Sequence, residues 1–167
     1  MGFVSPKLGM AEDFGADMTI DISGMSDAEL VAAVRDQTEG RGADAVILAV
    51  GGNGLIRTAM DAARPGGSIL LFAQTQHGEA VIDPAAICVD EKSLVGSYSA
   101  SVDLQDESVR FVMNREMDLE RLVSHRFPLE QSSEALDLAA HPQPSSMKIV
   151  IQPGSAWNSG IREGTSQ

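Results

Sequence analysis

A run of apolar residues at 42–52 ends in two glycines, a pattern that predicts a buried strand leading into a turn. Beyond the turn, residues 55–63 carry apolar side chains on one face of a 3.6-residue repeat, as in an amphipathic helix. Pro65-Gly66-Gly67 then breaks the helix, and residues 68–73 form a second apolar run. Strand, crossover helix and strand make a βαβ unit, whose two strands must be parallel. Ligands of open α/β sheets bind beyond the carboxyl ends of such strands, so we expect any site there.

Helix signals recur along the rest of the chain. Ser26 and Glu29 have the spacing of a capping box, so we expect a helix from there to about Thr38. Asp83 and Asp103 are the expected N-caps of two further helices. These two helices are predicted at 84–88 and 103–115. Two more helices are predicted at 7–14 and 131–140, and strands are predicted at 18–22, 93–98, 122–127 and 147–151. Residues 152–167 are rich in Gly and Ser and are predicted to form a disordered tail behind a folded domain at 5–151.

Charge and composition narrow the class of partner. The chain has 12 Lys and Arg against 24 Asp and Glu, a net charge of -12. Nucleic-acid binding needs clustered cations, so we expect no nucleic-acid partner. No apolar run reaches the length of a membrane span and residues 1–9 lack a signal-peptide pattern, so we expect no membrane and a cytoplasmic location. The one cysteine, Cys88, cannot form an internal disulfide, which fits a reducing compartment.

Seven short motifs together resemble a known family, the zinc-type medium-chain dehydrogenase/reductase superfamily, over residues 5–151. The match is nearest to its alcohol, sorbitol and threonine dehydrogenase-like branch. The motifs are Phe14-Gly15-Ala16-Asp17, Gly40-Arg41-Gly42-Ala43-Asp44, Pro65-Gly66-Gly67, Gly96-Ser97-Tyr98, His125-Arg126-Phe127-Pro128-Leu129, Glu134-Ala135-Leu136 and Met147-Lys148-Ile149-Val150. The resemblance implies an α/β fold that is a partial Rossmann domain, a doubly wound parallel sheet, in which residues 42–52 form strand four.

Several parts of such an enzyme have no counterpart in this sequence. The G-x-G-x-x-G turn after strand one, which binds the cofactor pyrophosphate, is absent. Strand two, whose acidic end residue holds the adenosine ribose, is absent too, so NAD and NADP cannot be told apart. The family's catalytic zinc has no ligands here, because Cys88 and the three histidines have no zinc-ligand spacing.

The missing strands bear on stability. In the strand order 3-2-1-4-5-6, strands one and two lie between three and four. Strand three, at 18–22, must therefore either pair with strand four out of context or stay unpaired. We expect a weakened, aggregation-prone domain unless a complementing chain or a second copy supplies the missing strands.

The resemblance implies that the nicotinamide side of the cofactor is lined by the residues that end strands four, five and six. These are Ala49, Val50, Gly51, Phe72, Ala73, Gln74, Val95, Gly96, Ser97 and Tyr98. The alternative is that the apolar members of this set are core residues and that Gly51-Gly52 is a plain turn. Without the phosphate loop, we expect this chain to bind NAD or NADP weakly or not at all.

Three other positions carry candidate chemistry. His125 could be a general base, but we favour a structural histidine on a strand. Cys88 has no cationic neighbour before Lys92, so we favour a buried, inert thiol over a nucleophile. Asp90 and Glu91 are adjacent carboxylates that do not converge on one substrate bond, so we favour a solvated loop at 90–92.

The expected function is that of the cofactor-binding half of a zinc-dependent alcohol dehydrogenase, which transfers hydride between an alcohol and nicotinamide. Because the zinc domain and the phosphate loop are absent, we expect no dehydrogenase activity from this chain alone. One alternative is a non-catalytic, truncated domain completed by a partner chain or by self-association. A third possibility is a nucleotide binder that uses strands four to six alone.

Overall fold

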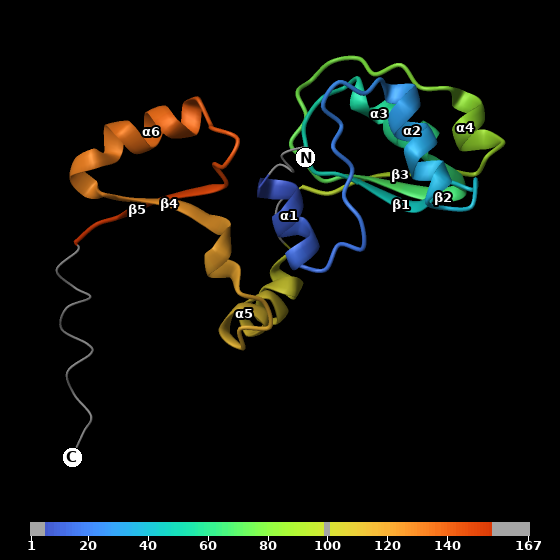
Figure 1. Cartoon of the computed structure of the whole chain (residues 1–167). Helices are drawn as coiled ribbons and strands as arrows, with labels where there is room; N and C mark the ends of the chain where they lie inside the picture. The colour runs from blue at the N-terminus through green and yellow to red at the C-terminus, as the bar shows by residue number, and fades with distance from the viewer. Residues whose placement is uncertain (1–5, 99–100, 155–167) are drawn as a thin grey trace. The chain divides into compact units, whose positions relative to one another are not determined.

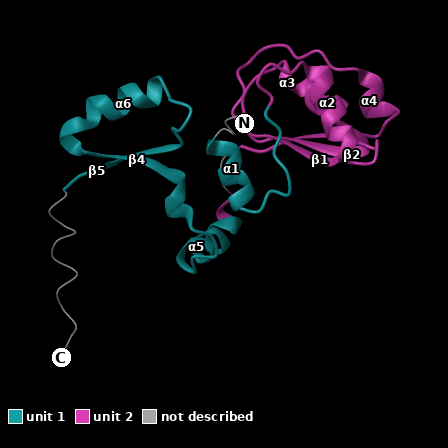
Figure 2. Ribbon diagram, viewed as in Figure 1, with its two compact units in different colours: residues 1–21, 103–167 teal, residues 22–102 magenta. Residues whose placement is uncertain are grey.

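The computed structural model describes residues 6–98 and 101–154, and the chain divides into two compact units (Figures 1 and 2). The central unit comprises residues 22–102, and the terminal unit comprises residues 1–21 and 103–167. Each unit contains helices and a sheet of parallel strands, with three strands in the central unit and two in the terminal one. The prediction of an α/β fold with parallel strands is confirmed.

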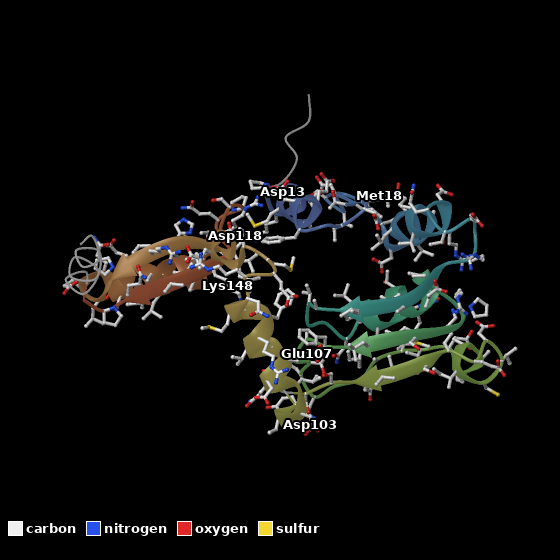
Figure 3. All side chains as sticks on the ribbon, turned by 90° about the horizontal axis from the view of Figure 1, so that it is seen from below. Asp13, Met18, Asp103, Glu107, Asp118 and Lys148 are labelled. Carbon is white, nitrogen blue, oxygen red and sulfur yellow. The ribbon has the colours of Figure 1, made fainter. Side chains whose placement is uncertain are left out.

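The sheet of the central unit has the order β1-β2-β3 (Figure 3 shows the three strands side by side). The helix α3 (Leu55–Ala62) joins β1 (Ala43–Leu48) to β2 (Ala63–Leu71), which confirms the predicted βαβ unit. The short helix α4 (Pro84–Cys88) precedes β3 (Ser93–Gly96). The N-cap at Asp83 is confirmed as well, because its carboxylate accepts the Ala85 N–H at 2.9 Å.

The strand β2 begins earlier than predicted, because Pro65-Gly66-Gly67 lies inside the strand rather than before it. The pairing of β1 with β2 is irregular at this point, between Ala43 and Ala45. A Cβ on Gly67 would lie 2.8 Å from the carbonyl oxygen of Arg64 and 3.1 Å from that of Ala43. Only glycine permits this close approach of the backbones. The glycine is therefore part of the strand and does not mark the end of the preceding helix.

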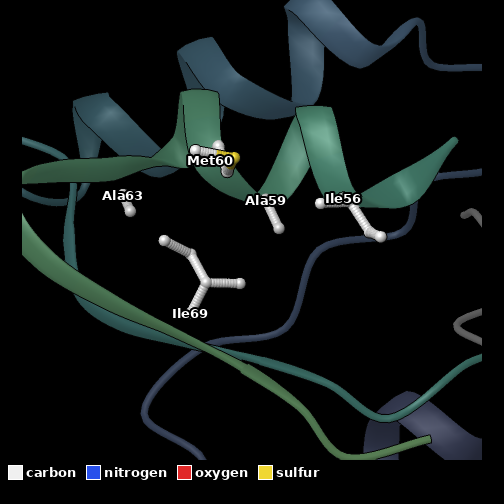
Figure 4. Packing of buried hydrophobic residues seen from close by; sticks show 5 residues of the cluster. All are labelled: Ile56, Ala59, Met60, Ala63 and Ile69. Carbon is white, nitrogen blue, oxygen red and sulfur yellow. The ribbon is translucent and has the colours of Figure 1, made fainter. Parts of the chain in front are cut away.

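One face of the sheet carries the core of the central unit. Ile69 of β2 is 0% exposed and packs against Ile56, Ala59 and Met60 of α3, together with Ala63 (Figure 4). The residues packed around this cluster are half-buried: Val46, Leu48, Leu71, Ile82 and Ala86. Ala86 belongs to α4 and Ile82 lies two residues before that helix, so both α3 and α4 cover the same face.

The opposite face of the sheet is apolar but exposed. The strand register places Ile47, Leu70 and Val95 in one row across β1, β2 and β3. Successive side chains of a strand point to opposite faces, so this row lies on the face away from Ile69. Ile47 is 63% exposed and Phe72, two residues beyond Leu70, is 61% exposed. The central unit therefore covers only one face of a sheet whose strands are apolar on both.

The helix α2 (Asp27–Asp36) begins with the predicted capping box, which is confirmed. The Glu29 N–H donates to the Ser26 hydroxyl at 3.3 Å, and the Ser26 N–H donates to the Glu29 carboxylate at 2.7 Å. The helix ends two residues before the predicted Thr38. It packs beside α3, where the Thr58 hydroxyl donates to the Asp27 carboxylate at 2.8 Å.

The terminal unit contains the second pair of strands. The helix α6 (Ser132–Ala140) connects β4 (Val123–Pro128) to the parallel β5 (Lys148–Gln152), as predicted to within a residue or two. Single 3-10 turns lie at Val102–Leu104, Leu119–Leu122 and Leu129–Gln131. The unit also holds α1 (Pro6–Asp13) and α5 (Gln105–Met113).

Two predictions in and around the terminal unit are wrong. The helix α5 begins after a 3-10 turn, so its N-cap position is Leu104 and not Asp103. Residues 18–22 form no strand. Alternating β-branched residues make a strand only where a neighbour pairs with their backbone, and in the described chain β1 pairs with β2 alone. Most of the predicted disordered tail, residues 155–167, lies outside the described residues.

Candidate functional site

The carboxyl ends of the three strands of the central unit lie in register at one edge of the sheet. Leu48 pairs with Leu71, and Leu71 pairs with Gly96. Beyond these residues the Phe72 N–H donates to the Leu48 carbonyl at 3.1 Å, and the Ser97 N–H donates to the Leu71 carbonyl at 3.1 Å. The three predicted groups of site residues therefore begin side by side, where ligands of open α/β sheets bind.

The predicted site residues are exposed, apart from Ala73, which is half-buried. Val50, Phe72, Val95 and Tyr98 all have large exposed side chains, and Ala49 is exposed as well. The alternative interpretation of Ala49, Val50, Phe72 and Val95 as core residues is wrong. Their apolar surface is available to a ligand or to a partner.

The loop after β1 and the loop after β2 are held together by a close contact and a hydrogen bond, a pair of contacts that we call the loop clasp. A Cβ on Gly51 would lie 2.7 Å from the carbonyl oxygen of Gln74, so the absence of a side chain lets the two backbones touch. The Asn53 amide donates to the carbonyl of Glu79 at 3.3 Å. A Cβ on Gly78 would lie 2.8 Å from that same amide nitrogen. Gly51 is thus more than a turn residue, because it fixes the spacing of the two loops.

A polar hollow of about 440 Å³ opens at the loop clasp. Its lining residues are Gly51, Gly52, Asn53, Gln74, Gln76 and His77. Three of these residues, Asn53, Gln76 and His77, are not among the predicted site residues. The signal that could have found them is the clustering of amide and imidazole groups in the two loops that follow paired strands. Such groups can donate and accept hydrogen bonds without adding charge.

His125 lies on β4 in the terminal unit, and its contacts are structural. Its Nδ1 lies 2.9 Å from the Ser124 hydroxyl, and its ring stacks on Phe127 with the centroids 6.4 Å apart. The Ser124 hydroxyl also donates to the Lys148 carbonyl at 3.2 Å and accepts the Met147 N–H at 2.8 Å. These bonds connect β4 with β5, which supports the structural interpretation of His125.

Two predictions near α4 are wrong. Cys88 is exposed rather than buried, because α4 is a single turn that places Ala86, and not Cys88, against the core. Lys92 is only 8% exposed, although it was assigned to a solvated loop. Its ammonium donates to the Met60 carbonyl in the last turn of α3 at 2.8 Å and lies 3.8 Å from the Asp90 carboxylate. The unpaired carbonyls at a helix C-terminus attract a cation, which explains this position.

Two carboxylates with shifted pKa values lie away from the strand ends. The backbone hydrogen bond from Ser26 lowers the pKa of Glu29, and a hydrogen bond from the Arg64 guanidinium lowers the pKa of Asp44. Asp44 lies near the start of β1, at the end opposite to the exposed loops. Both carboxylates therefore stabilise the structure and take no part in the site.

The described residues do not fit a zinc ion. Among residues 6–98 and 101–154, no three His, Cys, Asp or Glu side chains gather where they could hold a metal. The same part of the chain contains no helix with the length and apolar character of a membrane span.

Residues 4–114 match the family described as zinc-binding dehydrogenase. The chain belongs to the zinc-binding dehydrogenase family. The D-arabinitol dehydrogenase 1 of Uromyces fabae is 27% identical over 139 residues, which are 83% of this chain and 39% of that protein. The resemblance to the medium-chain dehydrogenases, stated from the motifs, is confirmed.

Solved structures of alcohol dehydrogenases share the fold of this zinc-binding dehydrogenase chain. The enzyme of Thermotoga maritima has a TM-score of 0.76 at 25% identity, over 89% of this chain and 41% of that one. An alcohol dehydrogenase of E. coli CFT073, solved in complex with the cofactor NADH, has a TM-score of 0.74 at 20% identity, over 88% and 41%. The chain thus spans about two fifths of the length of the relatives that it matches.

Proposed function

We propose that this chain carries the nicotinamide-facing half of the cofactor site of an alcohol or polyol dehydrogenase-like oxidoreductase. The observation that supports the proposal is that the exposed carboxyl ends of β1, β2 and β3 lie side by side at one edge of the sheet. Family membership and the dehydrogenases among its relatives supply the reaction class, hydride transfer between an alcohol and NAD or NADP. The nicotinamide ring, when bound, supplies the hydride acceptor or donor.

The residues of this edge have complementary tasks in the proposed site. The exposed apolar groups of Val50, Phe72 and Val95 offer a surface against which a planar ring can pack. The backbone of Gly51 and Gly52 can approach a ligand closely because it carries no side chain. The loop clasp fixes the distance between the first two loops, so these groups are held in place before a ligand arrives.

Two further parts of a complete site have no counterpart among the residues described. The sequence has no G-x-G-x-x-G turn that would present backbone N–H groups to a pyrophosphate. The described residues also offer no ligand set for the zinc that polarises the alcohol oxygen in such enzymes. We therefore expect weak binding of NAD or NADP and no turnover by this chain alone.

A turnover assay and a calorimetric titration test this proposal. The chain is assayed with NAD and with NADP against a panel of primary alcohols and polyols, and NADH is titrated into it. We expect no turnover and at most millimolar affinity. Steady turnover, or affinity in the micromolar range, would show that the chain contains the parts that we consider absent.

A second function, that of a non-catalytic domain completed by a partner chain or by its own copy, has its own support. The strand β1 pairs only with β2 in the described chain, and the sheet face that carries Ile47 and Val95 is uncovered within the central unit. Sedimentation velocity of the full chain tests this candidate, because completion by a second copy would give a dimer at micromolar concentration.

The location and the exclusion of other partners are also proposals. A single, unpaired Cys88 supports a reducing, cytoplasmic compartment. The net charge of -12 supports the absence of a nucleic-acid partner, because phosphates would be repelled. Retention of the purified chain on immobilised DNA at physiological salt would contradict the proposed absence of a nucleic-acid partner.

A further inference from the structure

The dipeptide Asn53-Gly54 joins the turn after β1 to α3 and occurs at no other place in the chain. A backbone nitrogen that follows an asparagine can attack the side-chain amide carbon of that asparagine. Glycine favours this attack, because it has no Cβ to shield the nitrogen and leaves the backbone free to turn. The other two asparagines of the chain are followed by arginine and by serine. The reaction therefore meets the least hindrance at Asn53.

The structure leaves the attacking nitrogen accessible. Gly54 is exposed, and a Cβ built on it would meet no atom within 4 Å. Gly54 precedes the first residue of α3, and in the described part of the chain its N–H donates no hydrogen bond. The attack requires such a free, unshielded N–H.

The hydrogen bonds that hold Asn53 are long. Its side-chain amide donates to the Glu79 carbonyl at 3.3 Å, and its own carbonyl accepts the Ile56 N–H at 3.4 Å. Bonds of this kind are ordinarily about 2.7–3.2 Å long, so both restrain the residue weakly. Asn53 also lines the polar hollow of about 440 Å³ at the loop clasp, which is large enough to hold water. The side chain can therefore turn toward the Gly54 nitrogen, and water can reach the product.

We propose that Asn53 is a site of spontaneous deamidation and that this modification opens the loop clasp. The Gly54 nitrogen forms a bond to the Asn53 Cγ, and the Cγ–Nδ2 bond breaks. The proton of the Gly54 N–H leaves with the amide nitrogen as ammonia, and a succinimide ring remains. One water molecule then opens the ring at either of its two carbonyls, which gives aspartate or isoaspartate at position 53. The reaction needs no oxidant and no co-reactant other than water.

Either product removes the hydrogen bond of the loop clasp. The Nδ2 atom of Asn53 is the donor to the Glu79 carbonyl, whereas the carboxylate that replaces the amide can only accept hydrogen bonds. Isoaspartate in addition lengthens the main chain by one carbon just before α3. The two loops are then held only by the close contact of Gly51 with Gln74. This inference rests on the loop clasp and does not require the proposed cofactor function.

The test incubates the full chain at physiological temperature and pH for several weeks and compares it with fresh protein. Trypsin cleaves after Arg41 and Arg57, and the fragment between them contains Asn53 as its one amide side chain. Mass spectrometry of this fragment measures deamidation, and methylation by isoaspartyl methyltransferase detects isoaspartate. The internal control is Asn114, which is exposed but is followed by the bulky Arg115.

Gly54→Ala is the matched variant, because the new Cβ shields the nitrogen and meets no other atom within 4 Å. We expect Asn53 to deamidate at least about tenfold faster in the wild type than in Gly54→Ala. It should also deamidate faster than Asn114. An unmodified wild-type fragment after incubation, or equal rates in the two chains, would overturn the proposal.

Hydrogen exchange measures the opening of the loop clasp. Asn53→Asp carries the carboxylate from the start, so its amides at 74–80 should exchange several-fold faster than those of the fresh wild type. The incubated wild type should approach this rate, and incubated Gly54→Ala should not. Amides at 68–71, in the core strand β2, are the reference and should be unchanged in all three chains. Unaltered exchange at 74–80 in Asn53→Asp would refute the opening of the clasp, whereas titration of fresh protein with NADH would still test the cofactor proposal separately.

Discussion

The replacement of Gly51 by alanine tests the loop clasp directly. The new Cβ would lie 2.7 Å from the Gln74 carbonyl oxygen, whereas a relaxed carbon–oxygen contact is about 3.3 Å or longer. The two loops would have to part by about half an ångström. Overpacking of this kind costs about 1–3 kcal/mol, so we expect the free energy of unfolding to fall by that amount.

Gly54→Ala is the matched control for Gly51→Ala. Gly54 has helical φ and ψ values of -66° and -28°, and a Cβ there meets no atom within 4 Å. Alanine at such a position leaves stability unchanged or raises it slightly, because the unfolded chain loses conformational freedom. Urea unfolding followed by circular dichroism measures both variants. Equal stability of the two would refute the close approach of Gly51 to Gln74, and with it the fixed spacing of the loops.

Three further substitutions test other contacts. Ile69→Ala should lower the unfolding free energy by about 2–5 kcal/mol and Ile69→Val by about 0.5–1.5 kcal/mol in urea titrations; similar values for both would contradict the tight core. Lys92→Met should cost about 1–2 kcal/mol, because the Met60 carbonyl loses its charged donor; a thermal melt that matches the wild type would count against this bond. Hydrogen bonds from Ser26 lower the pKa of Glu29 below its ordinary 4.5. The stability that these bonds add to the fold is therefore complete above pH 4.5 and is lost as the pH falls through the lowered pKa. Glu29→Gln should therefore flatten the acid limb of melting temperature against pH, and an unaltered limb would contradict the assignment.

The local part of the fold could be predicted from the sequence because its signals are local. Two such signals each depend on a few consecutive residues. The repeat of apolar residues between Leu55 and Ala63 predicts α3, and the spacing of Ser26 and Glu29 predicts the capping box. The strand predicted at 18–22 failed because a strand also needs a neighbour, which no pattern within five residues can supply.

The rest of the site depends on contacts between distant residues. The Asn53 amide meets the carbonyl of Glu79, 26 residues along the chain, and Lys92 reaches Met60, 32 residues away. Neither partner can be identified from composition or periodicity. The exposure of Cys88 likewise follows from the shortness of α4 and not from the apolar residues before it. The positions of the strand ends could be predicted, whereas the polar residues between the loops could not.

The most direct test of the proposed half-site compares two ligands by NMR on the isotopically labelled full chain. Reduced nicotinamide mononucleotide contains only the nicotinamide half of NADH, so a chain that recognises that half alone should bind both about equally. We expect both to shift the amide signals of the loops after β1, β2 and β3, with millimolar affinities that agree within a factor of about three. Much tighter binding of NADH, or an absence of shifts in these loops at saturating ligand, would contradict the account.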